Sequence, residues 1–277
     1  MTTETDQLVL SSRHEGVLTL AFNHPERFNA WNHDMERRYF SLLDEAATDP
    51  DVRVIVVTGN GKNFCPGADT THLATAATPL VLEGRRSQHH PLSIPKPIIG
   101  AINGGCAGIG FIQALMCDVR FAARDARFST AYARIGLPAE YGSAWILPRL
   151  IGMEKALDLL LSARRFGAEE AQSLGVVSRV CEPHEVVTAA QAYAADLAQH
   201  CSPRSMAAIR RQVWGDLSKG YLQANEDWLE VMRVYNVKAD NPDLAEGVAA
   251  FREKRLPNFA PLPPSFEAPE PPRFAPQ

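Results

Sequence analysis

The sequence predicts an α/β protein in which strands and helices alternate over the first half and helices dominate afterwards. Two short apolar runs, VRVIVVTG (52–59) and PIIGAIN (97–103), are typical of strands that are covered on both faces. The second run leads through a glycine-rich turn into an apolar helix. From about residue 143 onward, apolar residues recur mostly at helical spacing, which predicts a run of helices.

The other elements of the first half follow from their residue types. Residues 7–22 hold two β-rich runs separated by Arg13-His14-Glu15-Gly16, which predicts a hairpin. Apolar side chains at helical spacing predict a helix over 33–47. The segments 119–123 and 126–130 predict a third and a fourth strand after the two apolar runs.

The second half is expected to be mostly helical. The predicted helices are 143–150, 153–163, 168–174, 184–200, 203–217, 221–236 and 241–254. Only GVVSRV (175–180) is expected to interrupt them as a strand, and the Pro-rich tail to be extended, poorly ordered or docked. We therefore expect a core with the functional site over 1–200, a helical oligomerisation region over 201–256 and a tail over 257–277.

The composition argues against several classes of protein. Net charge is −4 with a pI near 6.1, and the basic residues are spread out, so no nucleic-acid surface is indicated. The five cysteines are widely spaced without a Cys-x-x-Cys pair, which indicates neither a zinc site nor a disulfide framework. The N-terminus lacks the pattern of a signal peptide, and no apolar window is long enough for a membrane span. A cytoplasmic protein without membrane or nucleic-acid partners is expected.

Two glycine-containing segments could present backbone N–H groups to a ligand. In FCPGADTTHL (64–73), Gly67 permits a tight turn that can aim the N–H of Ala68 into a pocket, although a plain loop has the same pattern. In NGGCAGIGFIQALMCD (103–118), a strand ends in glycines that open a helix, whose first N–H groups can stabilise negative charge. The spacing does not match a dinucleotide fingerprint. Close packing of helix on strand would require the same small residues.

A third segment, RIGLPAEYGSAWILPRLIG (134–152), offers one acidic side chain among apolar neighbours. Glu140 follows Pro138 and precedes a helix that opens near Ser143. The carboxyl could be a partly buried base whose pKa is raised toward working pH. Equally, it could be an ordinary acidic residue at a helix start.

Taken together, these segments resemble the crotonase superfamily, the enoyl-CoA hydratase/isomerase family. NHPERFNAWN (23–32) and GVAAFREKRLPNF (247–259) also fit, so the motifs agree in order and spacing over roughly residues 8–255. The resemblance implies a crotonase-like spiral of repeated ββα units with a C-terminal helical trimerisation region. It also implies an acyl-CoA thioester as ligand and assembly into trimers or dimers of trimers.

The resemblance carries over site residues position by position. The two amides of the oxyanion hole fall on Ala68 and Ile109, and the acid of the isomerase branch falls on Glu140. Seven residues fall where the family binds or lines its substrate: Arg27, Ala30, Pro66, Asp69, Thr70, Thr71 and Tyr132. No metal and no cofactor is implied, because coenzyme A enters only as part of the substrate.

This chain departs from the hydratase pattern at both of its glutamates. Counting back from Cys117, the first glutamate position holds Ile112. Counting between Phe128 and Gly136, the second holds Tyr132. Isoleucine moves no proton, and losing one positioned base typically costs about 10²–10⁴-fold in rate. A single acid suits an isomerase, which removes a proton from C2 of the thioester and returns it at C4.

Three alternatives to an isomerase remain at this point. Glu140 could act as a nucleophile in a thioester hydrolase or dehalogenase. Hydration could use Tyr132, Glu140 or a histidine such as His89 or His90 to position water, although solvated loop residues are expected at both histidines. The chain could also bind acyl-CoA without catalysis. Cys65 and Cys106 are interpreted as buried fillers.

Overall fold

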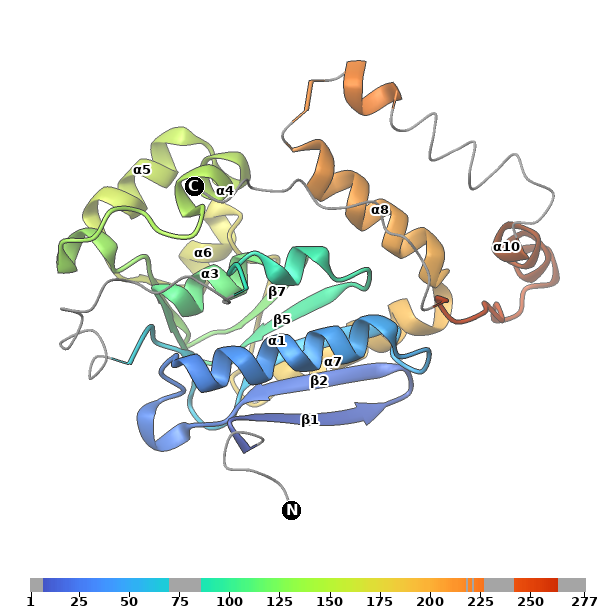
Figure 1. The fold of residues 1–277 in the computed structure, drawn as a ribbon, viewed down its shortest axis with the longest axis horizontal. Coiled ribbons are helices and arrows are strands. Elements are labelled where there is room, and N and C mark those ends of the chain that lie inside the picture. The colour runs from blue at the N-terminus through green and yellow to red at the C-terminus, as the bar shows by residue number, and fades with distance from the viewer. Residues whose placement is uncertain (1–6, 70–85, 218, 221, 227–241, 264–277) are drawn as a thin grey trace.

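The computed structural model describes residues 7–69, 86–217, 219–220, 222–226 and 242–263, and within these it forms two sheets flanked by helices (Figure 1). The larger sheet has the strand order β1-β2-β3-β5-β7-β10. Its strands are β1 (Val9–His14), β2 (Val17–Phe22), β3 (Val54–Gly59), β5 (Ile98–Ile102), β7 (Val119–Ala123) and β10 (Arg179–Cys181). The hairpin β1–β2 is antiparallel and every other pair in this sheet is parallel, so the expected hairpin and apolar strands are confirmed.

The smaller sheet has the order β4-β6-β8-β9. Its strands are β4 (Asn63–Cys65), β6 (Gly105–Ala107), β8 (Arg127–Ser129) and β9 (Phe166–Gly167). The chain moves from the larger sheet to the smaller one three times, from β3 to β4, from β5 to β6 and from β7 to β8. These repeated steps are the ββα turns of the expected spiral, and they bring the ends of β4 and β6 together.

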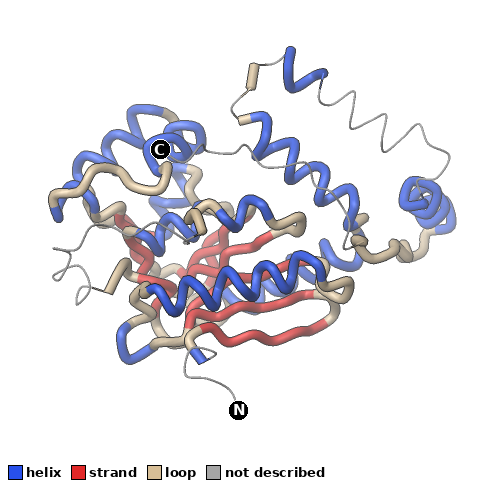
Figure 2. Tube along the Cα trace, viewed as in Figure 1, coloured by secondary structure: helices blue, strands red, loops and turns tan. Residues whose placement is uncertain are grey.

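Helices surround the sheets much as the periodicity predicts. They are α1 (His33–Thr48), α3 (Ile109–Leu115), α4 (Ser143–Ile151), α5 (Met153–Ser162), α6 (Ala168–Leu174), α7 (Val186–His200), α8 (Pro203–Asp216) and α10 (Pro242–Glu253). Of the helix expected over 221–236, residues 222–226 are helical and 227–236 lie outside the described residues. In Figures 1 and 2 α10 lies away from the two sheets and α8 runs along the edge of the body, in the region expected to mediate oligomerisation, a role that stays a prediction.

The strand expected over 175–180 is wrong in its first half. Gly175 has a φ of 91° and ends α6, and the N–H groups of Val176 and Val177 both donate to the carbonyl of Ala171. Because these amides close the helix, they cannot join a sheet, and pairing begins only at Arg179. The two valines are nevertheless buried, which explains why the run reads as a strand.

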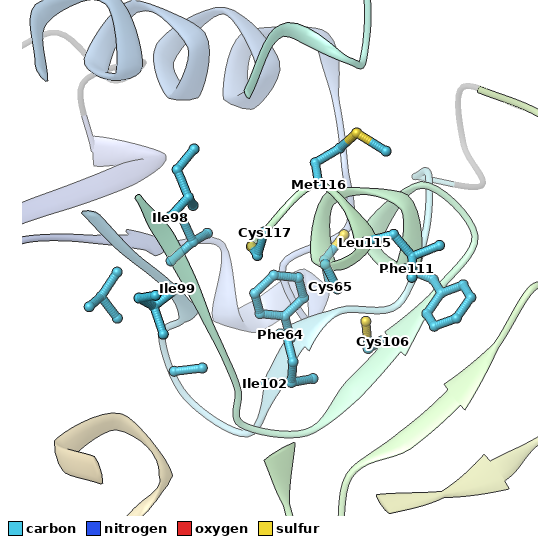
Figure 3. Packing of buried hydrophobic residues seen from close by; sticks show 14 of the residues in the cluster. Phe64, Cys65, Ile98, Ile99, Ile102, Cys106, Phe111, Leu115, Met116 and Cys117 are labelled. Carbon is cyan, nitrogen blue, oxygen red and sulfur yellow. The ribbon is translucent and has the colours of Figure 1, made fainter. Parts of the chain in front are cut away.

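The hydrophobic core lies between the sheets and around α3. Every residue of β3 and β5 is buried, so both faces of the larger sheet are covered. Helix α7 packs along β2, β3, β5 and β7, while α1 packs against β1 and β2. Figure 3 shows Phe64 of β4 at the centre of a cluster that includes Ile102, Cys106 and Cys117. Burial raises the pKa of the Cys65 thiol to about 12 and that of the Cys106 thiol well above its usual range, which supports the interpretation of these two cysteines as fillers.

A buried ion pair attaches α8 to the body. Arg210 donates from Nε to Asp118 at 2.7 Å, and its other nitrogens donate to the carbonyls of Pro91, Leu92 and Ile94. Beyond α10, Phe259 and Leu262 are buried, so the described part of the tail is docked, and residues 264–277 lie outside the described residues. Among the helices that the structure describes, none is both long and apolar enough to cross a membrane.

Candidate active site

The two predicted amides follow neighbouring strands of the smaller sheet. Strands β4 and β6 are parallel, with Cys65 opposite Cys106. Three residues beyond this pair the chain reaches Ala68 on one side and Ile109 on the other. A Cβ built on Gly67 would lie 3.5 Å from the carbonyl oxygen of Ala107. The two segments therefore run side by side past the ends of their strands.

The backbone of Ala68 faces the second segment. Trp31 forms an isolated parallel bridge with Ala68, in which the N–H of Trp31 donates to Gly67 O at 2.8 Å and the N–H of Asp69 donates to Trp31 O at 2.9 Å. Since backbone groups alternate along an extended chain, the N–H of Ala68 points away from Trp31. Its residue is exposed, whereas Gly67 and Asp69 are buried. The geometry leaves this N–H available to a ligand on the side of Ile109.

The second amide belongs to the first residue of α3. Gly108 precedes the helix without a side-chain cap, and its own N–H donates to Ser129 O. The first N–H groups of a helix have no partner within it, which applies to Ile109. A Cβ on Gly110 would lie 2.1 Å from the carbonyl oxygen of Cys65. The glycines therefore also serve the close packing of helix on strand that the sequence left open.

Glu140 stands in a tight turn before α4. Tyr141 and Gly142 both have positive φ, 49° and 72°, so the chain reverses directly after Glu140. The backbone N–H and the hydroxyl of the buried Ser143 both donate to the carbonyl oxygen of Glu140, at 3.0 and 2.8 Å. The carboxyl itself is half-buried, and this burial raises the pKa of Glu140. A turn with a carboxyl of raised pKa is a chemically plausible site for a general base.

Tyr132 connects this acid to the second amide. Its buried hydroxyl donates to the carbonyl oxygen of Gly108 at 3.5 Å, one residue before Ile109. Burial raises the pKa of Tyr132, and the neighbouring charge of Glu140 raises it further. The phenol is therefore neutral at ordinary pH and acts as a donor. Tyr132 therefore lies near Glu140 and also contacts the backbone that precedes Ile109.

The remaining predicted residues lie around this centre. Arg27 is exposed in the short 3-10 helix η2 (Pro25–Arg27), Ala30 is half-buried and Pro66 is exposed. The loop that carries Arg27 and Ala30 is held by the buried Asn29, whose Nδ2 donates to the carbonyl oxygens of Asn60 and Asn63 at 2.9 and 2.7 Å. Thr70 and Thr71 lie outside the described residues.

The expectation that His89 and His90 are solvated is wrong. Nε2 of His90 lies 2.7 Å from an oxygen of Asp44, and the ring packs edge-on against Phe40. His89 packs against Gly142, where a Cβ would lie 2.7 Å from its Nε2. Both rings are partly buried, and burial lowers the pKa of each. The preceding segment lacks periodicity, so only the structure could place His89 beside the turn that follows Glu140 and His90 beside Asp44.

Sequence reasoning also missed a buried polar cluster formed by Glu36, Gln88 and Gln113, which are 2%, 4% and 0% exposed. A signal existed for one of them. Glu36 precedes Tyr39 and Phe40 by three and four residues, so it lies on the buried face of the predicted helix. Among the described residues, no group of three or more His, Cys, Asp or Glu could hold a metal ion.

Known proteins resemble this chain over nearly its whole length. The family model described as enoyl-CoA hydratase/isomerase matches residues 12–261. The 1,2-epoxyphenylacetyl-CoA isomerase of Escherichia coli is 32% identical over 262 residues, covering 91% of this chain and 98% of the relative. A crystal structure of an enoyl-CoA hydratase from Mycobacterium marinum is 47% identical with a TM-score of 0.67, covering 77% of this chain and 100% of the other.

A second solved structure, an enoyl-CoA hydratase from Polaromonas, has a TM-score of 0.81 at 28% identity, covering 91% of this chain and 99% of the other. The names of these relatives include both isomerase and hydratase, so they agree on the class of thioester and differ on the reaction. The match spans both amide segments and the turn at Glu140. This chain therefore belongs to the enoyl-CoA hydratase/isomerase family, the crotonase superfamily, and is an acyl-CoA-processing enzyme.

Proposed function

We propose that this protein is an enoyl-CoA isomerase that moves a carbon–carbon double bond into conjugation with the thioester. In this proposal Glu140 removes a proton from C2 and returns it at C4. The N–H groups of Ala68 and Ile109 hold the thioester oxygen while it carries the negative charge of the dienolate. Proton and electron pair stay within the substrate and the carboxyl, so the reaction needs no metal, redox cofactor or water.

The observation that carries the proposal is the identity of the acid. Glu140 is half-buried, and its charge contributes to raising the pKa of Tyr132. The hydroxyl of Tyr132 reaches the backbone carbonyl of Gly108, beside Ile109. The two positions at which hydratases place glutamates hold Ile112, which is fully buried, and Tyr132, whose pKa is raised by burial. Neither residue can act as a base at neutral pH. One carboxyl is therefore available where hydration by the two-glutamate route would use two.

The environment of Glu140 suits a group that must both take and return a proton. Burial raises the pKa of Glu140, which brings the acid closer to the pH at which it works. A base of this kind needs to be ionised before the first step and protonated before the second. The isomerase name of the Escherichia coli relative lends this proposal support.

The test compares products from three thioesters of coenzyme A: a 3-enoyl, a 2-enoyl and an aryl thioester. An isomerase converts 3-hexenoyl-CoA to the conjugated isomer without a change of mass and with new ultraviolet absorbance. Glu140→Gln is expected to lower this turnover by about 10²–10⁴-fold while the thioester still binds. A variant with near-wild-type turnover would falsify the assignment of the base.

Two other outcomes identify the competing reactions. Gain of one water by the 2-enoyl thioester would identify a hydratase. Incorporation of oxygen-18 from solvent into Glu140 during a single turnover would identify a nucleophilic carboxylate in a hydrolase or dehalogenase. Assembly as a trimer or a dimer of trimers belongs to the same proposal and is measured by light scattering.

A further inference from the structure

The segment Ser87–His89 contacts both sides of the proposed site. Gln88 is buried and bonds to side chains of α1 and α3, whereas His89 is half-buried and packs against the turn that follows Glu140. Successive residues thus reach α3, which carries the Ile109 amide, helix α1, and the turn that follows the acid. The distance between those elements decides whether the base reaches the substrate carbon.

On the side of the first amide, Gln88 bonds to α1. Its Nε2 donates to Oε2 of Glu36 at 2.5 Å, and the same oxygen accepts from the indole N–H of Trp31 at 3.2 Å. Trp31 is the residue whose backbone brackets Ala68. A short chain of hydrogen bonds therefore runs from Gln88 to the segment that holds the Ala68 amide.

On the side of the second amide, Gln88 bonds to α3. Nε2 of Gln113 donates to Oε1 of Gln88 at 2.9 Å and to its backbone carbonyl at 3.3 Å. Gln113 lies one helical turn after Ile109. Because unpaired polar groups are costly inside a protein, these buried contacts hold Gln88 in one position.

His89 completes the connection on the side of the acid. Its ring hydrogen-bonds to the backbone of Tyr141, and Nε2 is the ring atom that faces Gly142. The hydroxyl of Ser87 lies 3.0 Å from Nδ1. A neutral ring with its proton on Nε2 donates to the Tyr141 carbonyl and accepts from Ser87, so both ring nitrogens have partners. Burial lowers the pKa of His89, which favours this neutral form.

We propose that His89 is a positioning residue, whose hydrogen bond to the backbone of Tyr141, anchored through Gln88, sets where the Glu140 carboxyl stands relative to the two amides. The proposal rests on the isomerase function proposed above. In this role His89 acts through the turn and takes no proton from the substrate. Its loss therefore affects the chemical step more than the binding of the thioester.

The first test replaces the ring itself. His89→Ala is expected to lower kcat for 3-hexenoyl-CoA by about 10–100-fold with KM within about twofold, because a misplaced base slows proton transfer. His89→Gln keeps an N–H donor near the position of Nε2 and is expected to recover most of the loss. Equal loss in both variants, or loss in KM alone, contradicts the proposal.

The second test displaces the ring without changing it. A Cβ on Gly142 would lie 2.7 Å from Nε2 of His89, so Gly142→Ala forces the ring to move. Gly136 is a matched control, since its φ and ψ of 78° and 19° resemble the 72° and 11° of Gly142, and a Cβ there meets nothing within 4 Å. Gly142→Ala is expected to lower kcat as His89→Ala does, and Gly136→Ala to leave it near the wild-type value. Similar kcat in the two glycine variants overturns the proposal.

A third measurement is independent of turnover. Nitrogen-15 spectra of the imidazole ring are expected to show a single neutral tautomer with the proton on Nε2 of His89 in the wild-type protein. A ring protonated on Nδ1, or one that averages between tautomers, contradicts the proposal even if an alanine variant fails to fold. If the wild-type protein does not isomerise 3-hexenoyl-CoA, the proposed function fails, and the spectra still decide whether His89 holds the turn.

Discussion

The hydroxyl of Tyr132 donates to the carbonyl oxygen of Gly108 at 3.5 Å, which joins the loop before Glu140 to the residue before Ile109. Tyr132, which the family resemblance aligns with a hydratase glutamate, therefore supports the backbone beside Ile109. The ring is 2% exposed, so it also fills the core. Replacement of the hydroxyl alone separates the two roles.

Tyr132→Phe is expected to leave the fold intact, because phenylalanine fills nearly the same volume. Loss of the bond to Gly108 is expected to lower kcat for 3-hexenoyl-CoA by about 2–12-fold, since one neutral hydrogen bond contributes roughly 0.5–1.5 kcal/mol. Steady-state kinetics with a thermal melt of each variant measure both effects. A drop of 10²-fold or more would indicate that the phenol acts directly on the substrate, as a proton carrier does.

The raised pKa of Glu140 predicts the pH dependence of both activity and stability. The base works when ionised, so kcat/KM is expected to rise with pH through a value above that of an ordinary glutamate. For stability, the folded state binds the proton more tightly than the unfolded state. The contribution is therefore present at low pH and is lost as pH rises through the folded pKa.

Glu140→Gln supplies the control for the pH dependence. Its free energy of unfolding is expected to fall less than that of the wild-type protein across the same pH range, measured by urea titration. A rate profile whose acidic limb matches a fully solvated glutamate would contradict the burial of this carboxyl.

Restoring a hydratase glutamate at Ile112 is expected to destabilise the protein. Ile112 is 0% exposed, and burying a carboxyl there without a partner costs several kcal/mol even after the carboxyl becomes protonated. Ile112→Val, which removes one methyl group, is expected to cost about 0.5–1.5 kcal/mol. Urea unfolding of the two variants compares them. If Ile112→Glu proved as stable as Ile112→Val, a polar partner would have to exist at this position.

The ion pair between Arg210 and Asp118 is expected to be essential for the docking of α8. Arg210→Met leaves Asp118 without its cation and leaves the carbonyls of Leu92 and Ile94 without donors, which is expected to cost about 3–5 kcal/mol. Arg124 is the control, because it is half exposed and pairs with two surface acids that water screens, so Arg124→Ala is expected to leave the urea midpoint close to that of the wild-type protein. Equal midpoints in urea for the two variants would contradict a distinct role for the buried pair.

Much of the fold could be predicted because long elements carry readable patterns. The hairpin and α1 have clear periods, and β3 and β5 are short, nearly all-apolar runs that are typical of strands covered on both faces. Strands β4, β6 and β9 are two or three residues long, too short for any period to appear. The sequence therefore predicts the smaller sheet only in part, although the segments that carry the two amides follow its strands β4 and β6.

The candidate site divides in the same way. Ala68, Ile109 and Glu140 lie in motifs whose glycines and prolines are visible in the sequence. Gln88 and His89 contact residues that are distant in the chain. Gln88 bonds to Glu36, 52 residues away, and His89 packs against Gly142, which lies beyond α3. Contacts of this kind depend on how the elements pack, which no local pattern encodes.

Cys65 of β4 and Cys106 of β6 lie opposite each other in the smaller sheet, and this register limits where the chain can be lengthened. Ala68 follows Cys65 by three residues, and Ile109 follows Cys106 by three residues. The two amides therefore lie side by side only while these two short connections have equal length. A one-residue insertion in either connection would turn one N–H to the opposite side and, in the proposed mechanism, leave a single donor for the thioester oxygen. Engineers who wish to enlarge the pocket should therefore lengthen the chain elsewhere and leave these two spans untouched.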